Sequence, residues 1–235
     1  MNKRFIRQAA LIGEAATEKL KSSRVALFGV GGVGSYALEA LVRSGVGNID
    51  VFDNDTVAES NINRQLIATG STVGQKKIDV AAQRARDINP DIAIHGYDIF
   101  YLPDTADGVD LSQYDYIIDA IDTVTAKIEL IVRAEKLNVP LISVMGTGNK
   151  LDPTALRVDD IYKTRGCPLA RVMRTELKKR GIKKLTVVWS EETPLTPNDL
   201  AEIKADGRKT PGSTAFVPAA AGIIAAAEVV KNLTK

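Results

Sequence analysis

The chain has 235 residues, of which 45% are hydrophobic and 26% are charged, and its formal net charge at pH 7 is +2. This composition is typical of a soluble globular protein with enough apolar material for one large α/β domain. A single cysteine excludes an internal disulfide framework and a zinc site of four cysteines. The N-terminal segment is charged throughout and lacks the apolar core of a signal peptide, so we expect a cytoplasmic protein.

Residues 4–21 predict one or two short helices, with apolar side chains available for packing. Arg7 lies among them. Taken alone, Arg7 is better explained as a solvated charge on a surface helix than as a phosphate contact.

Residues 24–55 have the pattern of a strand, a glycine turn, a helix and a second strand. The first apolar run is Val25 to Phe28, and the second is Ile49 to Phe52. Between them lies an Ala/Leu-rich segment at helical spacing that starts near Val33. The turn contains four glycines: Gly29, Gly31, Gly32 and Gly34.

Such a turn lets the backbone come close to a ligand, and the N-terminus of the following helix attracts phosphate. Asp53 ends the second strand, 19 residues after Gly34, where a carboxylate can hydrogen-bond ribose hydroxyls. We therefore expect a nucleotide at this edge of the sheet. The alternative is that the glycines serve only close packing, and the spacing alone does not distinguish ATP from a nicotinamide dinucleotide.

Polar side chains follow the second strand in loops that leave the same edge of the predicted sheet, which is where ligands bind in open α/β folds. The candidates for cofactor binding in this stretch are Asp53, Asp55, Asn61, Arg64, Gln65 and Lys77. The charges suit a polyphosphate whose ribose faces Asp53 and whose oxygens face Arg64 and Lys77. A helix is predicted from about Lys76 to Asn89.

Three more strands are predicted, at Ile92–Tyr97, Tyr116–Ala120 and Leu141–Met145. Their alternation with helices predicts an α/β fold with a doubly wound, mainly parallel, Rossmann-like sheet. His95, the single histidine, lies on the first of the three and is given no role. Asp122 follows the second and is interpreted either as the N-cap of a helix over 124–137 or as a metal ligand.

The predicted organisation is an ATP-binding domain over 1–150, with 151–235 as a small α+β extension of the same domain. The extension contains strands at Leu156–Val158 and Leu185–Trp189, and a helix from Pro168 to just before Gly181. A flexible loop is expected over 191–214. The apolar run of 13 residues from Ala215 is too short to span a bilayer, so we expect a final helix packed on the sheet and no membrane insertion.

The segment from Arg165 to Lys184 holds eight basic residues and one acid, a local charge of +7 that leaves the rest of the chain near −5. This run is either a solvated face or the contact surface for a polyanion. The candidates for binding RNA are Arg165, Arg171, Arg174 and Lys178.

Taken together, these motifs resemble the HesA/MoeB/ThiF family of adenylating enzymes, which includes ubiquitin-activating enzymes and bacterial proteins of thiamin and molybdopterin synthesis. The matching elements are RFIRQ, GVGGVGS, DNDTV, N-x-N-R-Q, VGQKK and DAID. The resemblance implies activation of a carboxylate with ATP and magnesium. It places Gly31, Gly32, Asn61, Arg64 and Lys77 at the phosphates, Asp53 at the ribose and Asp122 at the metal ion. It also implies a homodimer in which Arg7 reaches the partner subunit's site.

The required chemistry agrees with these residues. An ionised carboxylate needs no general base to attack the α-phosphate, and the charge on the triphosphate can be neutralised by Arg, Lys and a divalent ion. We therefore expect catalytic roles for Arg64, Lys77, Asp122 and Arg7. The chain has no G-x-x-x-x-G-K-[ST] phosphate loop, so these side chains must do its work.

The C-terminal half, with CPLARVMR and EETP, resembles the branch of the family that dehydrates threonylcarbamoyladenosine in tRNA to its cyclic form. The alternatives are adenylation of a ubiquitin-like sulfur-carrier protein, with a sulfur-transfer partner, and a nicotinamide dehydrogenase. Cys167 departs from the acidic residue expected at its position in this branch. It is either an activated nucleophile at a helix N-terminus or an ordinary helix cap, and the structural interpretation is preferred.

Overall fold

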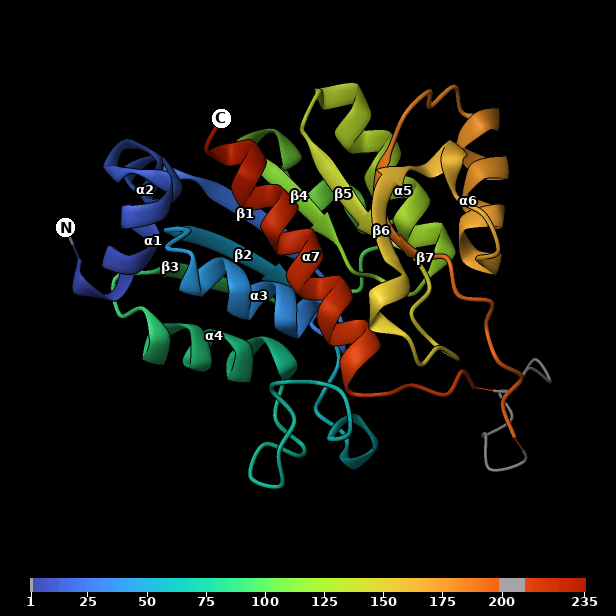
Figure 1. The fold of residues 1–235 in the computed structure, drawn as a ribbon, viewed down its shortest axis with the longest axis horizontal. Helices are drawn as coiled ribbons and strands as arrows, with labels where there is room; N and C mark the ends of the chain where they lie inside the picture. The colour runs from blue at the N-terminus through green and yellow to red at the C-terminus, as the bar shows by residue number, and fades with distance from the viewer. Residues whose placement is uncertain (1, 199–209) are drawn as a thin grey trace.

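The computed structural model describes residues 2–198 and 210–235. In these ranges the chain forms a seven-stranded sheet with the order β3-β2-β1-β4-β5-β7-β6 and with helices on both faces (Figure 1). All neighbouring strands are parallel except β6, which pairs antiparallel with β7. The predicted doubly wound, mainly parallel sheet is confirmed.

The strands are β1 (Arg24–Phe28), β2 (Asn48–Phe52), β3 (Ala93–Tyr97), β4 (Tyr116–Asp119), β5 (Leu141–Val144), β6 (Leu156–Asp160) and β7 (Thr186–Ser190). The α-helices are α1 (Ile6–Ile12), α2 (Glu14–Ser22), α3 (Gly34–Arg43), α4 (Lys77–Ile88), α5 (Val124–Leu137), α6 (Pro168–Lys179) and α7 (Phe216–Leu233). Short 3-10 helices are η1 (Lys3–Phe5), η2 (Glu59–Asn61), η3 (Ala106–Gly108), η4 (Leu111–Gln113), η5 (Pro153–Ala155) and η6 (Ile161–Lys163).

The two faces of the sheet are buried by different helices. Val25 and Leu27 of β1 point to a core closed by α2, α3, α4 and α7. Ala26 and Phe28 point to the opposite core, which α5 and the segment over 97–114 cover. A third cluster, between α5, α6 and β7, completes the core beside the added strands. Both faces of β1 are therefore apolar, as expected for a central parallel strand.

The last helix, α7, packs on the sheet beside α3 as predicted. Its Gly222 fits directly against the start of α3, because a Cβ atom there would lie 2.2 Å from the carbonyl oxygen of Val33. By length and composition alone α7 could cross a membrane, but Ala221, Ala225 and Val229 lie in the main core. The small residues of α7 thus allow close helix packing.

Two expectations for the chain after β5 are refined. The strand predicted at Leu156–Val158 extends to Asp160, and the strand predicted at Leu185–Trp189 is shifted by one residue. Both extend the main sheet beyond β5, in the order β5-β7-β6. The loop expected over 191–214 contains no helix or strand at 191–198 and 210–214. The prediction of flexibility for its centre falls on 199–209, outside the described residues.

A buried carboxylate joins the first strands to the segment that covers them. Asp50 of β2 is 1% exposed and accepts hydrogen bonds from Arg24 Nη2 at 2.7 Å and from the hydroxyl of Tyr114 at 2.8 Å. His95 Nδ1 lies 3.1 Å from its other oxygen. Burial and the bond to Asp50 raise the pKa of Tyr114 well above its usual range, so its hydroxyl stays protonated and donates.

We predict that Tyr114→Phe lowers the free energy of unfolding by about 1.5–3 kcal/mol, the scale for a hydrogen bond to a charged group. The ring contacts with Phe52 and Arg24 remain, so the loss reports on the hydroxyl. Urea denaturation followed by circular dichroism measures it. Tyr36→Phe is the control, because the Tyr36 hydroxyl makes no hydrogen bond within the described residues. Equal stability of both variants would contradict a structural role for the buried network.

Candidate functional site

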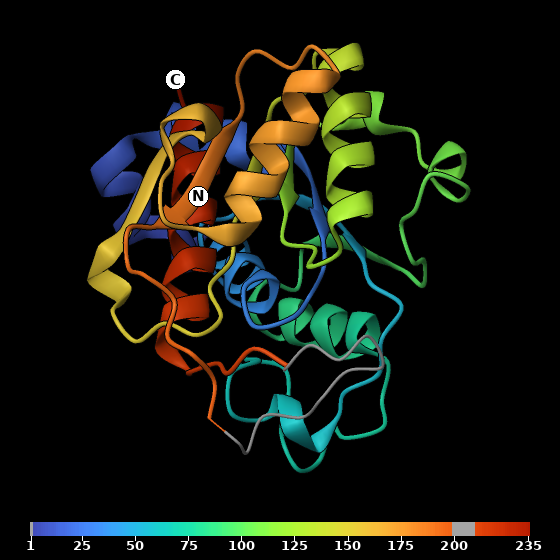
Figure 2. The same ribbon diagram turned by 90° about the vertical axis from the view of Figure 1, so that its right-hand side faces the viewer.

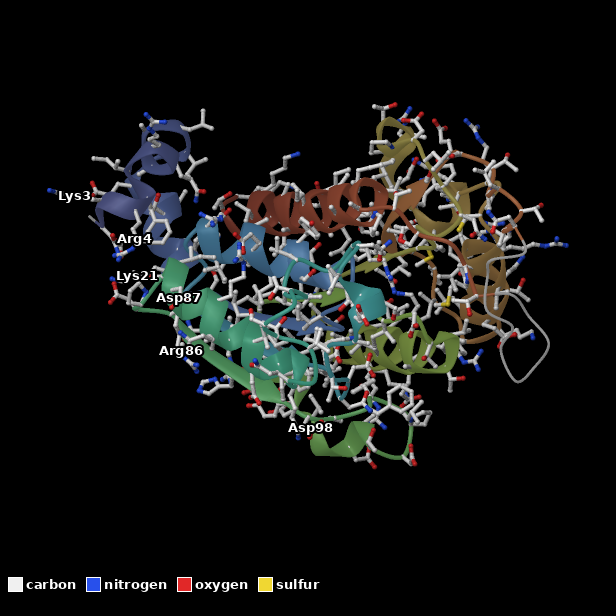
Figure 3. All side chains as sticks on the ribbon, turned by 90° about the horizontal axis from the view of Figure 1, so that it is seen from below. Lys3, Arg4, Lys21, Arg86, Asp87 and Asp98 are labelled. Carbon is white, nitrogen blue, oxygen red and sulfur yellow. The ribbon has the colours of Figure 1, made fainter. Side chains whose placement is uncertain are left out.

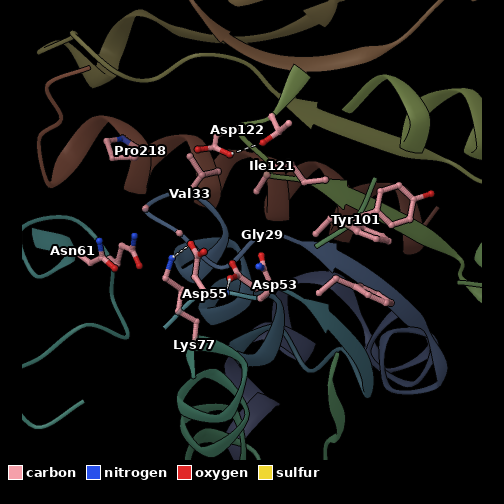
Figure 4. Close-up of a pocket in the computed structure, with 18 of the residues that line it drawn as sticks. Gly29, Val33, Asp53, Asp55, Asn61, Lys77, Tyr101, Ile121, Asp122 and Pro218 are labelled. Carbon is pink, nitrogen blue, oxygen red and sulfur yellow. Dashed lines mark hydrogen bonds and ion pairs between the residues drawn. The ribbon is translucent and has the colours of Figure 1, made fainter. Parts of the chain in front are cut away.

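A cavity of about 520 Å³ opens where β1, β2 and β4 end and α3 begins (Figure 4). Figure 2 looks onto this side of the molecule, with α6 above and the loop between β2 and α4 below. The cavity brings together most of the residues predicted from the sequence: Gly29, Gly31, Gly32, Asp53, Asp55, Asn61, Arg64, Gln65, Lys77 and Asp122. Gly34 and Arg7 do not line it.

The glycines of the turn have different physical roles. Gly29 has a φ of +88°, and a Cβ atom there would lie 2.8 Å from the carbonyl oxygen of Ala120. A Cβ atom at Gly34 would lie 1.8 Å from the carbonyl oxygen of Gly29. A Cβ atom at Gly31 would meet only Gln65 Nε2, at 3.8 Å. Gly29 and Gly34 are therefore needed for backbone packing, while Gly31 keeps the cavity open.

Asp53 is placed at the cavity wall, as predicted, and it also holds the glycine turn. Its Oδ2 accepts the N–H of Val30 at 2.7 Å, and its Oδ1 accepts the N–H of Asp55 at 2.9 Å. Burial raises the pKa of Asp53 despite these two bonds. The carboxylate thus ties the end of β2 to the turn after β1, a role that sequence spacing could not reveal.

Among the described residues, the two basic side chains that line the cavity have partners within the protein. Lys77 Nζ lies 2.6 Å from Asp55 Oδ2, and the lysine side chain is 6% exposed while that of Asp55 is 62% exposed. Arg64 Nη1 donates to the carbonyl oxygen of Ser60 at 2.8 Å and to Asn63 Oδ1 at 2.9 Å. Both cations are therefore held beside the cavity, and an anionic ligand would take over part of these contacts.

Gln65 and Asn61 supply the amide groups of the site. Gln65 is 6% exposed, and its Oε1 is buried without a hydrogen-bond partner in the described residues. Asn61 Oδ1 accepts the N–H of Ala58 at 3.1 Å, which turns the loop over 58–61 toward the cavity. An unpartnered buried amide oxygen at a cavity wall is a group that a ligand or water can satisfy.

Asp122 lies in the bend between β4 and α5, and one of its two interpretations is wrong. The N-cap residue of α5 is Thr123, and Asp122 accepts no bond from a helix N–H. Its Oδ1 accepts a hydrogen bond from the hydroxyl of Thr123, at 3.3 Å. The exposed carboxylate is therefore available to a ligand at the cavity mouth.

The donor set at Asp122 fits a magnesium ion only if the ligand supplies further oxygens. Within 2–198 and 210–235, no group of three or more His, Cys, Asp or Glu side chains could hold a metal ion by itself. Mg²⁺ is commonly held by one or two carboxylates together with substrate phosphates and water. Asp122 beside a phosphate-binding turn matches that arrangement.

Aromatic side chains form a wall of the cavity that sequence reasoning missed, because no helix or strand was predicted between Tyr97 and Tyr116. Phe100 and Tyr101 line the cavity, and in Figure 4 Tyr101 lies across it from Asn61. The Tyr101 ring meets the Phe28 ring edge-on, with 4.9 Å between the ring centroids. Burial raises the pKa of the Tyr101 hydroxyl to about 12. The sequence signal was the cluster of Tyr97, Phe100 and Tyr101, which begins at the last residue of β3.

Arg7 lies on α1, exposed, and does not reach the cavity of its own chain. Figure 1 shows α1 at the opposite edge of the molecule from α6. A role of Arg7 in a partner subunit's site stays a prediction.

The four candidates for RNA binding differ in whether their side chains are already bonded to other protein groups. Arg165 pairs with Glu191 at 2.6 Å, and Arg174 Nη1 donates to the carbonyl oxygen of Thr164 at 3.0 Å. Arg171 and Lys178 are exposed on α6, and their side chains make no ion pair or hydrogen bond with other described residues. Arg174 is therefore an anchor of α6 to the chain before it.

The turn after α6 adds two lysines that were not singled out from the sequence. Lys183 and Lys184 are exposed, again without an ion pair to other described residues.

Cys167 occupies the N-cap position of α6, but its thiol makes no capping hydrogen bond. It is 3% exposed and packs in the cluster that contains Met173 and Leu177. Its predicted position before the first residue of α6 is confirmed. Its burial argues against an accessible nucleophile.

The sequence and the fold are both similar to those of known proteins. The ThiF family model matches residues 5–235. The chain is 45% identical over 241 residues to tRNA threonylcarbamoyladenosine dehydratase of Bacillus subtilis, and the match covers 98% of this chain and 94% of that protein.

The fold is also similar to crystal structures of Escherichia coli tRNA N6-threonylcarbamoyladenosine dehydratase, TcdA. The complex with AMP has a TM-score of 0.89 at 36% identity, covering 98% of this chain and 94% of that chain. The complex with ATP has a TM-score of 0.87 at 34% identity, covering 98% and 93%.

We predict that Gly31→Val weakens ATP binding by about tenfold or more, equivalent to about 1.4 kcal/mol, without lowering the melting temperature. The added side chain projects into the cavity rather than into the fold. Isothermal titration with ATP and thermal unfolding measure the two effects. Gly70→Val is the matched control, since a Cβ atom at Gly70 meets nothing within 4 Å and the residue lies outside the cavity. Full ATP affinity in Gly31→Val would move the ligand away from this turn.

Proposed function

The chain belongs to the ThiF family, and from that membership we propose that it catalyses the ATP-dependent dehydration of threonylcarbamoyladenosine in tRNA, through an adenylate of the substrate's carboxylate. The observation that carries this proposal is the match to the tRNA threonylcarbamoyladenosine dehydratase of Bacillus subtilis. The match covers 98% of the chain, so it includes the C-terminal half as well as the nucleotide site. A tRNA substrate also fits the expected cytoplasmic location.

The reaction needs two displacements, and the substrate supplies both nucleophiles. A carboxylate oxygen first attacks the α-phosphorus of ATP, and pyrophosphate leaves. A neighbouring nitrogen of the same modified base then attacks the activated carbonyl carbon and loses its proton, and AMP leaves as the ring closes. Neither step requires a protein nucleophile, which agrees with a cavity that contains no cysteine or histidine among its lining residues.

The protein's contribution is charge and position. Lys77 and Arg64 would stabilise the negative charge on the α-phosphate and on the departing pyrophosphate. Asp53 would bind the ribose, and Gly31 would let the backbone approach the phosphates. Asp122 would hold Mg²⁺, which neutralises phosphate charge when bound.

The proposed homodimer would complete this set. Arg7 is exposed on α1 and remote from its own cavity, so a phosphate contact by Arg7 requires a second copy of the chain. Such a contact would add a third cation to Arg64 and Lys77.

The alternative is adenylation of a sulfur-carrier protein. Relatives of that type usually have paired cysteines for zinc and a separate catalytic cysteine, whereas this chain has one cysteine and it is buried. A carrier or sulfur-transfer partner is therefore the weaker proposal.

Incubation with ATP and Mg²⁺ decides between the two. We expect AMP release and a product lighter by one water with tRNA that carries threonylcarbamoyladenosine, measured by mass spectrometry of the nucleosides. Unmodified tRNA and a carrier protein with a C-terminal Gly-Gly are the comparison substrates. AMP release with the carrier alone would overturn the proposal.

We predict that Arg64→Ala and Lys77→Ala each lower the rate of adenylation by about 10²-fold, the scale for losing one electrostatic contact to a transition state. Rapid-quench measurement of pyrophosphate release reports the step. Lys76→Ala is the matched control, because Lys76 pairs with Asp98 and does not line the cavity. A folded variant at Arg64 or Lys77 with full activity would remove that residue from the site.

The basic face of α6 is proposed to contact the tRNA backbone. Figure 2 shows α6 on the same side of the molecule as the loop between β2 and α4, and residues of that loop line the cavity. On α6 and the turn after it, the positive charge comes from four side chains that make no ion pair or hydrogen bond with other described residues, namely Arg171, Lys178, Lys183 and Lys184. Arg165 and Arg174 already bond to protein groups, so we expect them to contribute less to tRNA binding.

We predict that changing these four residues to Glu weakens tRNA binding by about tenfold or more at low salt and flattens the dependence of log K on log salt, because fewer counterions are released. ATP affinity should not change. Fluorescence anisotropy with labelled tRNA at several salt concentrations makes the measurement.

The control changes three basic residues to Glu on a distant surface, namely Lys3, Arg4 and Lys21. Figure 3 shows these three together on the side away from α6. If the control weakens tRNA binding as much as the α6 variant does, the effect comes from net charge, and α6 is not the contact surface.

A further inference from the structure

A fully buried ionic cluster lies beneath the bend that carries Asp122. Asp119 ends β4, Lys127 lies in the first part of α5, and Ser143 belongs to β5; all three are 0% exposed. Lys127 Nζ lies 2.9 Å from Asp119 Oδ2 and 3.3 Å from Ser143 Oγ. Ser143 Oγ donates to the same carboxylate oxygen at 2.5 Å.

The two oxygens of Asp119 have separate tasks. Lys127 and Ser143 bind Oδ2, while Oδ1 accepts the backbone N–H of Ile121 at 3.1 Å. The cluster therefore fixes the first half of the bend over 120–123 through Ile121. Lys127 also fixes the second half, because its own backbone N–H donates to the carbonyl oxygen of Thr123 at 3.0 Å.

Asp122 is the residue between these two fixed points. It is exposed, lines the cavity, and has no partner within the described residues other than the Thr123 hydroxyl. Its direction is thus set by the backbone of the bend and not by its own contacts. A buried ion pair is a poor source of stability, because the cost of removing two charges from water offsets their attraction. The pair at Asp119 and Lys127 therefore calls for an explanation beyond stability.

We propose that Asp119, held by Lys127 and Ser143, is a positioning residue that aims the Asp122 carboxylate at the divalent cation of the ATP site. The proposal rests on the proposed role of Asp122 as a metal ligand. In this proposal, the hydrogen bond from the Ile121 N–H to Asp119 Oδ1 is the contact through which the buried cluster fixes the backbone of the bend.

Two double variants separate this hydrogen bond from the charge pair. Both remove both charges and replace Lys127 by Met. Asp119→Asn with Lys127→Met retains an oxygen that accepts the Ile121 N–H, whereas Asp119→Leu with Lys127→Met does not. Neutral replacement of a buried pair by side chains of similar volume is often tolerated, so both variants should fold.

The measurement is Mn²⁺ binding followed by electron paramagnetic resonance, with the ATP analogue that has a methylene group between the α- and β-phosphates. We expect the Leu/Met variant to bind Mn²⁺ about tenfold more weakly or worse, the usual cost of losing a supporting contact behind a metal ligand. The Asn/Met variant should bind close to the unsubstituted protein. Unchanged affinity in the Leu/Met variant, or an equal loss in both variants, overturns the proposal.

Two further proteins keep every outcome informative. Asp122→Asn tests the metal ligand itself: if it leaves Mn²⁺ affinity unchanged, the proposed role of Asp122 fails and this inference with it. If Asp122→Asn weakens binding and the Leu/Met variant does not, only the inference fails. Should the Leu/Met variant not fold, Ser143→Ala removes one restraint on Asp119 and should give a smaller loss in the same direction; unchanged affinity there also overturns the proposal.

Leu177→Ala controls for destabilisation. Leu177 is fully buried in α6, in the cluster between α5, α6 and β7, so its truncation leaves a cavity without removing any hydrogen bond of Asp119, Lys127 or Ser143. Its Mn²⁺ affinity should equal that of the unsubstituted protein. A loss as large as that of the Leu/Met variant would mean that instability alone weakens the metal site.

Discussion

The close backbone contact between the turn after β1 and the end of β4 is the constraint on which the site depends. A side chain at Gly34 would overlap the carbonyl group of Gly29, and one at Gly29 would collide with that of Ala120. Because both are glycine, the start of α3, the glycine turn and the bend after β4 meet at one point. Asp53 adds the end of β2 by accepting the N–H of Val30 at 2.7 Å. Three strand ends thus converge around a single cavity, with a helix N-terminus directed at it.

Around that point, basic side chains are paired with protein groups whose place the oxygens of a polyphosphate could take. Lys77 is buried while its partner Asp55 is largely exposed. The surrounding protein therefore fixes the lysine side chain, whereas the Asp55 carboxylate is free to move away from it. When phosphate oxygens approach, the ammonium group can change partner without leaving its place. Such preorganised charge needs little rearrangement during the reaction, which is the main source of electrostatic catalysis. The single carboxylate of Asp122 complements this set, because phosphates themselves would supply the other oxygens to a cation.

The parts of the structure that could be predicted are those encoded by local pattern. The strand, glycine turn and helix over 24–43, the positions of the later strands along the chain and the position of Cys167 before a helix follow from periodicity and turn chemistry. The parts that could not be predicted depend on pairs that are distant in sequence. Nothing local indicates that Arg174 bonds back to Thr164, or that Asp119 meets Ser143 across neighbouring strands. The N-cap interpretation of Asp122 was wrong because the helix begins at Val124, as predicted, so that Thr123 and not Asp122 is the residue directly before it.

The burial of Cys167 connects the structure of α6 to the proposed reaction. A thiol at a helix N-terminus beside basic residues would be an activated nucleophile if it were accessible. Here it is 3% exposed and packed among Met173 and Leu177. A reaction in which the substrate carboxylate attacks ATP, and a nitrogen of the same base then attacks the adenylate, has no step for a protein thiol. In this interpretation, the N-terminus of α6 is free to serve packing, and the basic side chains on its outer face are free to bind a large polyanion. The division between a buried, unreactive face and an exposed, cationic face is what a nucleic-acid substrate that carries its own nucleophiles would require.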